Sequence, residues 1–353
     1  MTRVILLVHG MGVHGSDWAT DAIAGLTKAA KTYRLDGKLG ATIKKGAVAI
    51  RTVEYDSQFT QILGRWGKDA RALAEHISTN ALPVPANLIS WLNNADQTEN
   101  NFLWSHLIDV ILYRFFSEIT TSVRVHVMEQ VAKAWKEALD VDSTARVTIV
   151  AHSLGTSVTH DSLALLSTKP PQGCDGFLAG DRRLAGIFML ANVSRELETS
   201  PQVYDSTIAP PSVRGSKAYT AELYNVHHEL DPFTAPRRFR PSWGGDDYSD
   251  IITTGIREFN THSFERYVDD PRFHIPFLQS IFGFDAVDEA AAAAAIAAYD
   301  AAAGPPCPQV LADFVQDCRQ RIQLIEDSSD IKTLVAAGVH FLADIQAVRA
   351  RCK

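Results

Sequence analysis

Residues 146–166 read RVTIVAHSLGTSVTHDSLALL, and this stretch decides the fold. Its first five residues are rich in β-branched side chains, as in a strand buried in a parallel sheet, and residues 157–166 carry apolar side chains at helical spacing. Ser153 is therefore expected on the turn between a strand and a helix. Such a tight turn strains the backbone of the serine and needs small residues two positions before and after it. Ala151 and Gly155 meet this need.

A strand followed by a glycine-rich loop is also predicted near the beginning of the chain. Residues 4–8 form a continuous apolar run, which is typical of a strand buried on both faces, and His9-Gly10-Met11-Gly12 follows it. The loop has neither the Gly-x-Gly-x-x-Gly of a dinucleotide site nor the Gly-Lys-Ser/Thr of a phosphate-binding loop. His9 and His14 have no second metal ligand at suitable spacing, so we expect His9 to hold the loop by hydrogen bonds.

Strands and helices alternate along most of the chain. The predicted strands are 4–8, 48–53, 146–150, 184–190, 219–226 and a last one beginning at 251, and the predicted helices include 17–34, 119–139 and 270–284. This alternation predicts an α/β protein with a mostly parallel sheet flanked by helices.

Two segments exceed what such a sheet requires. Helical patterns without a convincing strand fill about residues 57–130, which we interpret as an insertion in a domain that spans residues 1–284. The aromatic residues within 102–116 are interpreted as helix packing, with a lid over an acyl chain or a lipid surface as the alternative. Residues 285–353 are predicted to be a C-terminal helical extension, which either docks on the core or forms a homodimer contact.

Composition and charge argue against several classes of protein. The chain has 353 residues, of which 46% are hydrophobic, and this suffices for a large core. A net charge of −7 leaves no basic surface for nucleic acid. The most apolar helical stretch, 107–116, is interrupted by Asp109 and Arg114, so no transmembrane segment is expected. Four scattered cysteines and the lack of a leader before the first strand predict a cytoplasmic protein, and no cofactor motif or metal-ligand spacing was found.

The strand, turn and helix around Ala151-His152-Ser153-Leu154-Gly155 resemble the nucleophile elbow of the α/β-hydrolases, which is usually Gly-x-Ser-x-Gly. Alanine at the first small position also occurs in a branch of small bacterial lipases of that fold. The other interpretation of Ser153 is that it caps the helix that follows. The resemblance covers about residues 3–284 in strand order. It implies an α/β-hydrolase fold, in which the insertion at 57–130 would be a helical cap over the substrate pocket.

The resemblance also implies roles for particular residues. Ser153 would be the nucleophile. Asp231, which follows the predicted strand 219–226, would be the acid, and His262, in the loop after the last strand, would be the base. The order Ser, Asp, His along the chain is the order of this family. The backbone N–H groups of Met11 and Leu154 would form the oxyanion hole.

Other residues stay open as alternatives for these roles. Asp231 begins an Asp-Pro pair, which also favours a turn, and both roles can hold at once. Glu196 and Asp205 are rival acids, and His227 and His228 are rival bases. The two adjacent histidines could also bind a metal together with Asp231, but the set lacks a further ligand.

Together these roles imply a serine hydrolase of the esterase or lipase type, which cleaves a small-molecule or lipid-like carboxylic ester through an acyl-enzyme on Ser153. No cofactor is needed for this chemistry. One alternative is acyl transfer or thioester cleavage by the same triad. The other is a hydrolase-like scaffold that binds a partner or a lipid without turnover, because a fold alone does not determine an activity.

Overall fold

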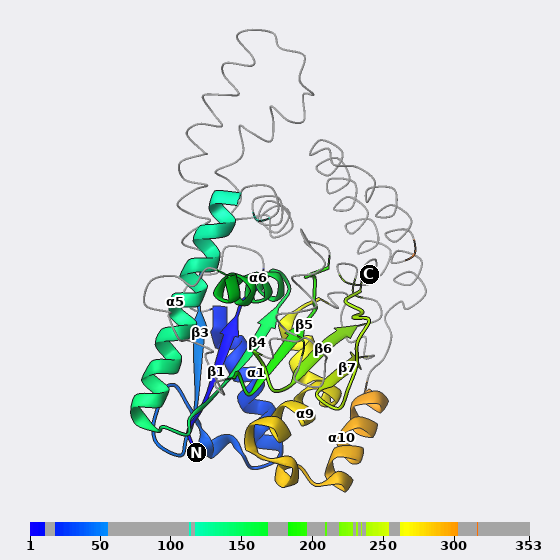
Figure 1. The fold of residues 1–353 in the computed structure, drawn as a ribbon. Helices are drawn as coiled ribbons and strands as arrows, with labels where there is room; N and C mark the ends of the chain where they lie inside the picture. Colours follow the sequence, from blue (N-terminus) through cyan, green and yellow to red (C-terminus); the bar gives the residue numbers. More distant parts are fainter. Residues whose placement is uncertain are drawn as a thin grey trace, which may run out of the picture.

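A seven-stranded parallel sheet is the centre of the computed structural model of this chain (Figure 1). The structure describes residues 1–10, 18–55, 113, 117–168, 183–195, 209, 219–228, 231, 234, 238–253, 262–302 and 316. All pairs of neighbouring strands are parallel. The predicted α/β class and the mostly parallel sheet flanked by helices are therefore confirmed.

The order of the strands creates a switch point at the middle of the sheet. The strands are β1 (Arg3–Val8), β2 (Leu39–Gly40), β3 (Val48–Val53), β4 (Arg146–His152), β5 (Gly186–Leu190), β6 (Leu223–His228) and β7 (Tyr248–Thr253). They lie in the order β2-β3-β1-β4-β5-β6-β7, so the chain first extends the sheet on one side of β1 and then on the other. In open α/β sheets, ligands bind at the carboxyl ends of the strands beside such a reversal. The carboxyl ends of β1 and β4 are therefore the expected location of a site.

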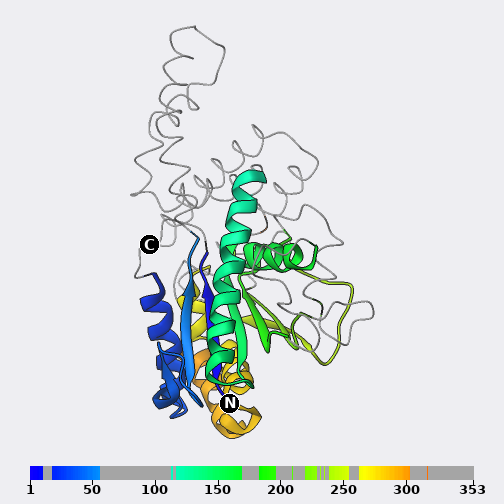
Figure 2. The same ribbon diagram turned by 60° about the vertical axis from the view of Figure 1, so that its left-hand side comes forward.

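Helices cover both faces of the sheet. They are α1 (Trp18–Thr32), α5 (Ser117–Val141), α6 (Leu154–Thr168), α8 (Phe264–Asp269), α9 (Pro271–Phe282) and α10 (Glu289–Ala302), with the short 3-10 helices η1 (Asp36–Lys38) and η3 (Phe284–Ala286). Helices α5 and α6 contribute to the core on one face, and α1, α8 and α9 contribute to the core on the other. Figure 2 shows α1 and α5 on opposite sides of the sheet.

The side chains of β1 alternate between the two halves of the core. Val4, Leu6 and Val8 face the α5 and α6 side, whereas Ile5 and Leu7 face the α1 and α9 side. Because both faces of the strand are covered, its sequence shows an unbroken apolar run instead of the alternation of a half-exposed strand. This is why the central strands could be recognised from the sequence.

The strands nearer the edge differ from their predicted bounds. Strand β7 begins at Tyr248 and ends at Thr253, whereas the sequence suggested a beginning at Ile251. It is an edge strand with several partly exposed or exposed residues, so it lacks a continuous apolar run. Strand β6 extends to His228, which places both adjacent histidines within the strand and not after it.

The described parts of the two additional segments lie against the sheet domain. Helix α5 overlaps the end of the predicted cap, and its Val123 and Val127 belong to the core. Helix α10, within the predicted extension, lies against α9, and Arg272 forms an ion pair with Asp300 at 2.7 Å. Residues 56–112, 114–116, 303–315 and 317–353 lie outside the described residues, and the division into domain, cap and extension stays a prediction. Among the described helices, none combines the length and the hydropathy that a membrane-spanning helix needs.

Candidate active site

Ser153 occupies a strained turn between β4 and α6. Its φ is 53°, in the left-handed region that residues other than glycine rarely adopt. Its backbone N–H donates to the carbonyl of Leu190 at 3.0 Å, and this bond anchors the turn to the end of β5. Such backbone strain costs roughly 1–3 kcal/mol and persists only where the surrounding structure imposes it. The turn therefore has the geometry that the sequence predicted.

Gly155 allows the first turn of α6 to lie against the end of β1. A Cβ atom at this position would lie 2.2 Å from the carbonyl oxygen of His9 and 2.7 Å from that of Val8. Both oxygens belong to the backbone, so neither can move away without displacing the strand. Ala151, the other small residue of the turn, is completely buried, and its methyl group belongs to the core on the α5 and α6 side.

Gly155→Ala is expected to destabilise the protein by about 3 kcal/mol or more, because the added methyl group forces α6 away from β1. Chemical denaturation of the variant would measure the change in the free energy of unfolding. Gly37→Ala is the matched control, since nothing lies within 4 Å of a Cβ at Gly37. Equal stability of the two variants would show that the backbone contact at Gly155 is not as close as described.

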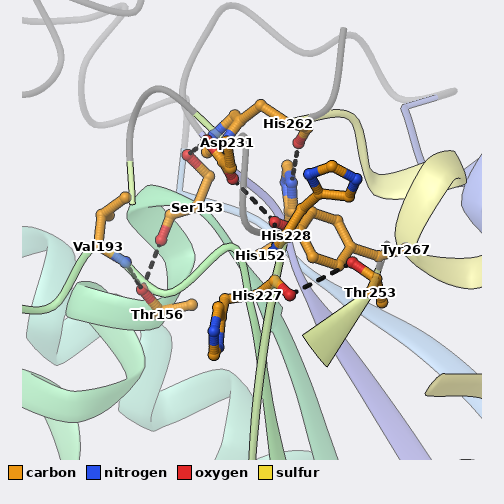
Figure 3. A network of polar contacts seen from close by, with 10 residues as sticks. All are labelled: His152, Ser153, Thr156, Val193, His227, His228, Asp231, Thr253, His262 and Tyr267. Carbon is orange, nitrogen blue, oxygen red and sulfur yellow. Dashed lines mark hydrogen bonds and ion pairs between the residues drawn. The ribbon is translucent and has the colours of Figure 1, made fainter. Parts of the chain in front are cut away.

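Thr156 connects the strained turn with the loop after β5 by hydrogen bonds. Its hydroxyl donates to the carbonyl of Ser153 at 2.6 Å and accepts the N–H of Val193 at 3.2 Å, as Figure 3 shows. The threonine is buried, so the two bonds are shielded from water. No sequence pattern marks this residue, because a threonine in the first turn of a helix is not distinctive.

Hydrogen bonds join the side chains of Ser153, His262 and Asp231 in a row (Figure 3). Nε2 of His262 lies 2.7 Å from Oγ of Ser153, and Nδ1 lies 2.9 and 2.8 Å from the two carboxylate oxygens of Asp231. A carboxylate accepts, so the ring carries its proton on Nδ1, and Nε2 is left to accept the serine proton. The structure thus brings together three residues that lie far apart in the sequence.

Burial strengthens the interaction between the histidine and the carboxylate. The side chain of Asp231 is 0% exposed, and His262 is 6% exposed. In such a poorly solvated place the charge of the carboxylate acts on the ring with little screening. This arrangement favours transfer of a proton from the serine to Nε2, because the positive ring that results would lie beside Asp231.

Two further side chains hold this row of residues, and neither was singled out from the sequence. Nε2 of His152 donates to the backbone carbonyl of His262 at 2.7 Å, and the centroids of the two rings lie 5.2 Å apart. The hydroxyl of Tyr267, in α8, donates to Oδ2 of Asp231 at 2.8 Å. His152 occupies the first unspecified position of the Gly-x-Ser-x-Gly pattern, so the motif does not mark it. Tyr267 lies in a six-residue helix that is too short to show helical periodicity.

Among the rival residues, His227 lies beside another carboxylate, His228 contributes a backbone N–H to a different contact, and the two acids lie outside the described part of the chain. Nδ1 of His227 lies 3.3 Å from Asp250, and the backbone N–H of His228 donates to Tyr267. Glu196 and Asp205 are outside the described residues. The described part of the chain contains no group of three or more His, Cys, Asp or Glu side chains that could hold a metal ion.

One of the two predicted oxyanion donors can be placed. Leu154 is the first residue of α6, and the first N–H groups of a helix have no partner within the helix. The positive end of the helix dipole adds to the attraction of an anion there. Met11 lies outside the described residues, and the oxyanion role of both donors stays a prediction.

The segment that follows β1 passes directly beside the serine. A Cβ at Gly10 would lie 2.9 Å from Cβ of Ser153, and therefore only glycine lets the backbone come this close. Nδ1 of His9 bonds the carbonyl of Gly10 at 2.7 Å, which agrees with the expectation that His9 holds the loop. The ring of Tyr55 stacks on His9 at 3.9 Å, and its hydroxyl contacts the carbonyl of His9 at 2.8 Å.

Comparison with models of protein families found no match for this chain, and comparison with curated proteins found none either.

Proposed function

We propose that this protein is a serine hydrolase of the α/β-hydrolase fold that cleaves carboxylic esters. The hydrogen-bonded row of Ser153, His262 and Asp231 at the carboxyl edge of the parallel sheet is the observation that carries the proposal. The left-handed backbone of Ser153 and the close approach of Gly155 to β1 support the elbow. The order of the three residues along the chain supports the same fold family.

In the first half of the proposed reaction, Oγ of Ser153 attacks the acyl carbon of the ester while Nε2 of His262 takes the hydroxyl proton. The carbonyl oxygen becomes negative, and the N–H of Leu154, with that of Met11, would stabilise it. Collapse of this intermediate breaks the bond to the alcohol. The leaving oxygen takes the proton from His262, and the acyl group stays on Ser153.

In the second half, a water molecule replaces the alcohol. His262 takes a proton from the water as its oxygen attacks the acyl carbon, and then returns the proton to Oγ of Ser153 as the carboxylic acid leaves. Asp231 keeps the ring in the required tautomer and stabilises the protonated ring in both halves. The same residues could also cleave a thioester or transfer the acyl group to an acceptor other than water. Hydrolysis of an ester is the simplest of these three reactions.

A fluorophosphonate probe is expected to label the native protein at Ser153. These probes react with serines that a neighbouring base activates, and His262 lies within hydrogen-bond distance of Ser153. Mass spectrometry of the digested protein would locate the modified residue. Turnover of p-nitrophenyl esters from acetate to palmitate, measured on the same preparation, would show which acyl lengths are accepted.

Ser157→Ala is the matched control for the labelling, because Ser157 is a buried serine in α6, the helix that begins directly after Ser153. This variant should label as the native protein does. No label on the native protein, or a label on a different serine, would contradict the proposal. An unreactive Ser153 would favour a scaffold that binds a ligand without turnover.

A further inference from the structure

The hydroxyl of Tyr267 connects the carboxylate of Asp231 with the backbone of β6. It lies 2.8 Å from Oδ2 of Asp231 and 3.1 Å from the backbone nitrogen of His228 (Figure 3). Tyr267 is 1% exposed, and Asp231 is fully buried. Water therefore does not compete for these bonds.

The two contacts determine the direction of the phenolic proton. An N–H group can only donate, so the hydroxyl of Tyr267 accepts from His228 through a lone pair. The single proton of the hydroxyl is then directed at Asp231, since a carboxylate can only accept. Burial, followed by the negative charge of Asp231, raises the pKa of Tyr267 well above its ordinary value, so the phenol keeps this proton.

The phenol and the imidazole ring share the same carboxylate. Oδ2 of Asp231 lies 2.8 Å from the hydroxyl of Tyr267 and also 2.8 Å from Nδ1 of His262. A donor on one side of the carboxylate limits its rotation and withdraws part of its negative charge. Both effects reach His262 without any direct hydrogen bond from the phenol to the ring.

We propose that Tyr267 is a positioning residue for the Ser153 site: anchored by the N–H of His228, its hydroxyl sets the orientation and the charge of the Asp231 carboxylate that receives Nδ1–H of His262. This inference rests on the proposed function for its kinetic consequences. Its geometric part, the control of the bond between His262 and Asp231, can be tested without turnover.

Several charged or titratable groups surround His262 and contribute to its environment. Asp231 and Tyr267 lie on the Nδ1 side, and His152 bonds the backbone carbonyl of His262. Arg238 acts electrostatically on Tyr267, and His228 binds the phenol through its backbone. Replacement of the phenol alone leaves these other groups in place, so a change in pH dependence can be assigned to the lost hydroxyl.

Tyr267→Phe is expected to lower kcat/KM for a p-nitrophenyl ester roughly 10- to 100-fold, because Asp231 loses the donor that orients its carboxylate toward Nδ1 of His262. The acid limb of the pH profile should move to higher pH, because the carboxylate then carries more charge beside the protonated ring. In NMR spectra, the proton on Nδ1 of His262 should move downfield for the same reason. 3-Fluorotyrosine incorporated at position 267 is a stronger hydrogen-bond donor. It should move the acid limb to lower pH and the Nδ1 proton of His262 upfield.

Tyr113→Phe is the matched control, since the buried hydroxyl of Tyr113 donates to a different buried carboxylate, Asp161, at 2.8 Å. It should change neither the acid limb nor the Nδ1 proton. If Tyr267→Phe does not fold, the fluorotyrosine protein decides alone. An acid limb and a Nδ1 resonance that stay unchanged in the folded Tyr267 variants would overturn the inference. Failure of native Ser153 to label would instead contradict the proposed function, and the NMR measurement would still decide the role of Tyr267.

Discussion

Ser153→Ala and His262→Ala are each expected to lower kcat for p-nitrophenyl esters about 10⁶-fold, and the double variant is expected to lose no more than either single variant. The reason is that the hydroxyl and the ring act as one unit. Without Nε2 of His262, which lies 2.7 Å from Oγ, the serine keeps its proton and is a poor nucleophile. Without the hydroxyl of Ser153, the ring of His262 has no nucleophile to activate.

Steady-state kinetics of the three variants would measure this non-additivity. Residual hydrolysis above that in water should persist in all three, since the oxyanion donors and substrate binding remain. Circular dichroism would check that each variant is folded, because alanine at position 262 removes the ring that pairs with the buried carboxylate of Asp231. A double variant that loses the product of the two single losses would show that Ser153 and His262 act independently, and the proposed mechanism would then be wrong.

Asp231→Asn is expected to reduce kcat about 10⁴-fold, the loss seen when the orienting carboxylate of a serine protease is replaced by its amide. The shape of the residue is kept, but the amide can present its NH₂ group to Nδ1 of His262. The ring would then hold its proton on Nε2, the nitrogen that faces Ser153, and could not accept the serine proton. Steady-state kinetics on the ester accepted best would measure the loss.

Asp250→Asn provides the matched control for this prediction. Asp250 is a carboxylate on the neighbouring strand β7 that also lies beside a histidine, His227, at 3.3 Å. Its replacement should leave kcat/KM nearly unchanged. A large loss in Asp250→Asn with little loss in Asp231→Asn would instead favour the rival histidine as the base.

The central part of the fold could be predicted because burial on both faces leaves a clear pattern. Strands β1, β3 and β4 lie within two residues of their predicted bounds, since each contains at least three consecutive buried residues. The two-residue strand β2 and the edge strand β7 are partly exposed, so their sequences lack this pattern. The bounds of central strands follow from hydrophobicity, whereas those of edge strands depend on their neighbours.

The residues of the candidate site were predicted to different extents for a similar reason. Ser153 lies in a local motif, and Asp231 and His262 could be chosen from their order along the chain. Tyr267 and His152 could not, because their role depends on which atoms the folded chain brings within hydrogen-bond distance of the other three. No spacing in the sequence marks a tyrosine whose proton is directed at a carboxylate by a backbone amide.

The pairing of β1 with β4 has a consequence for the protein during its synthesis. Arg3 lies beside Arg146 in the sheet, and the site is completed only by His262 and by the helix that carries Tyr267. In a chain emerging from the ribosome, Ser153 would therefore be synthesised well before His262, the residue that accepts its proton. Long-range pairing of this kind forms slowly, so reactivity at the serine would arise late, when most of the sheet has already assembled.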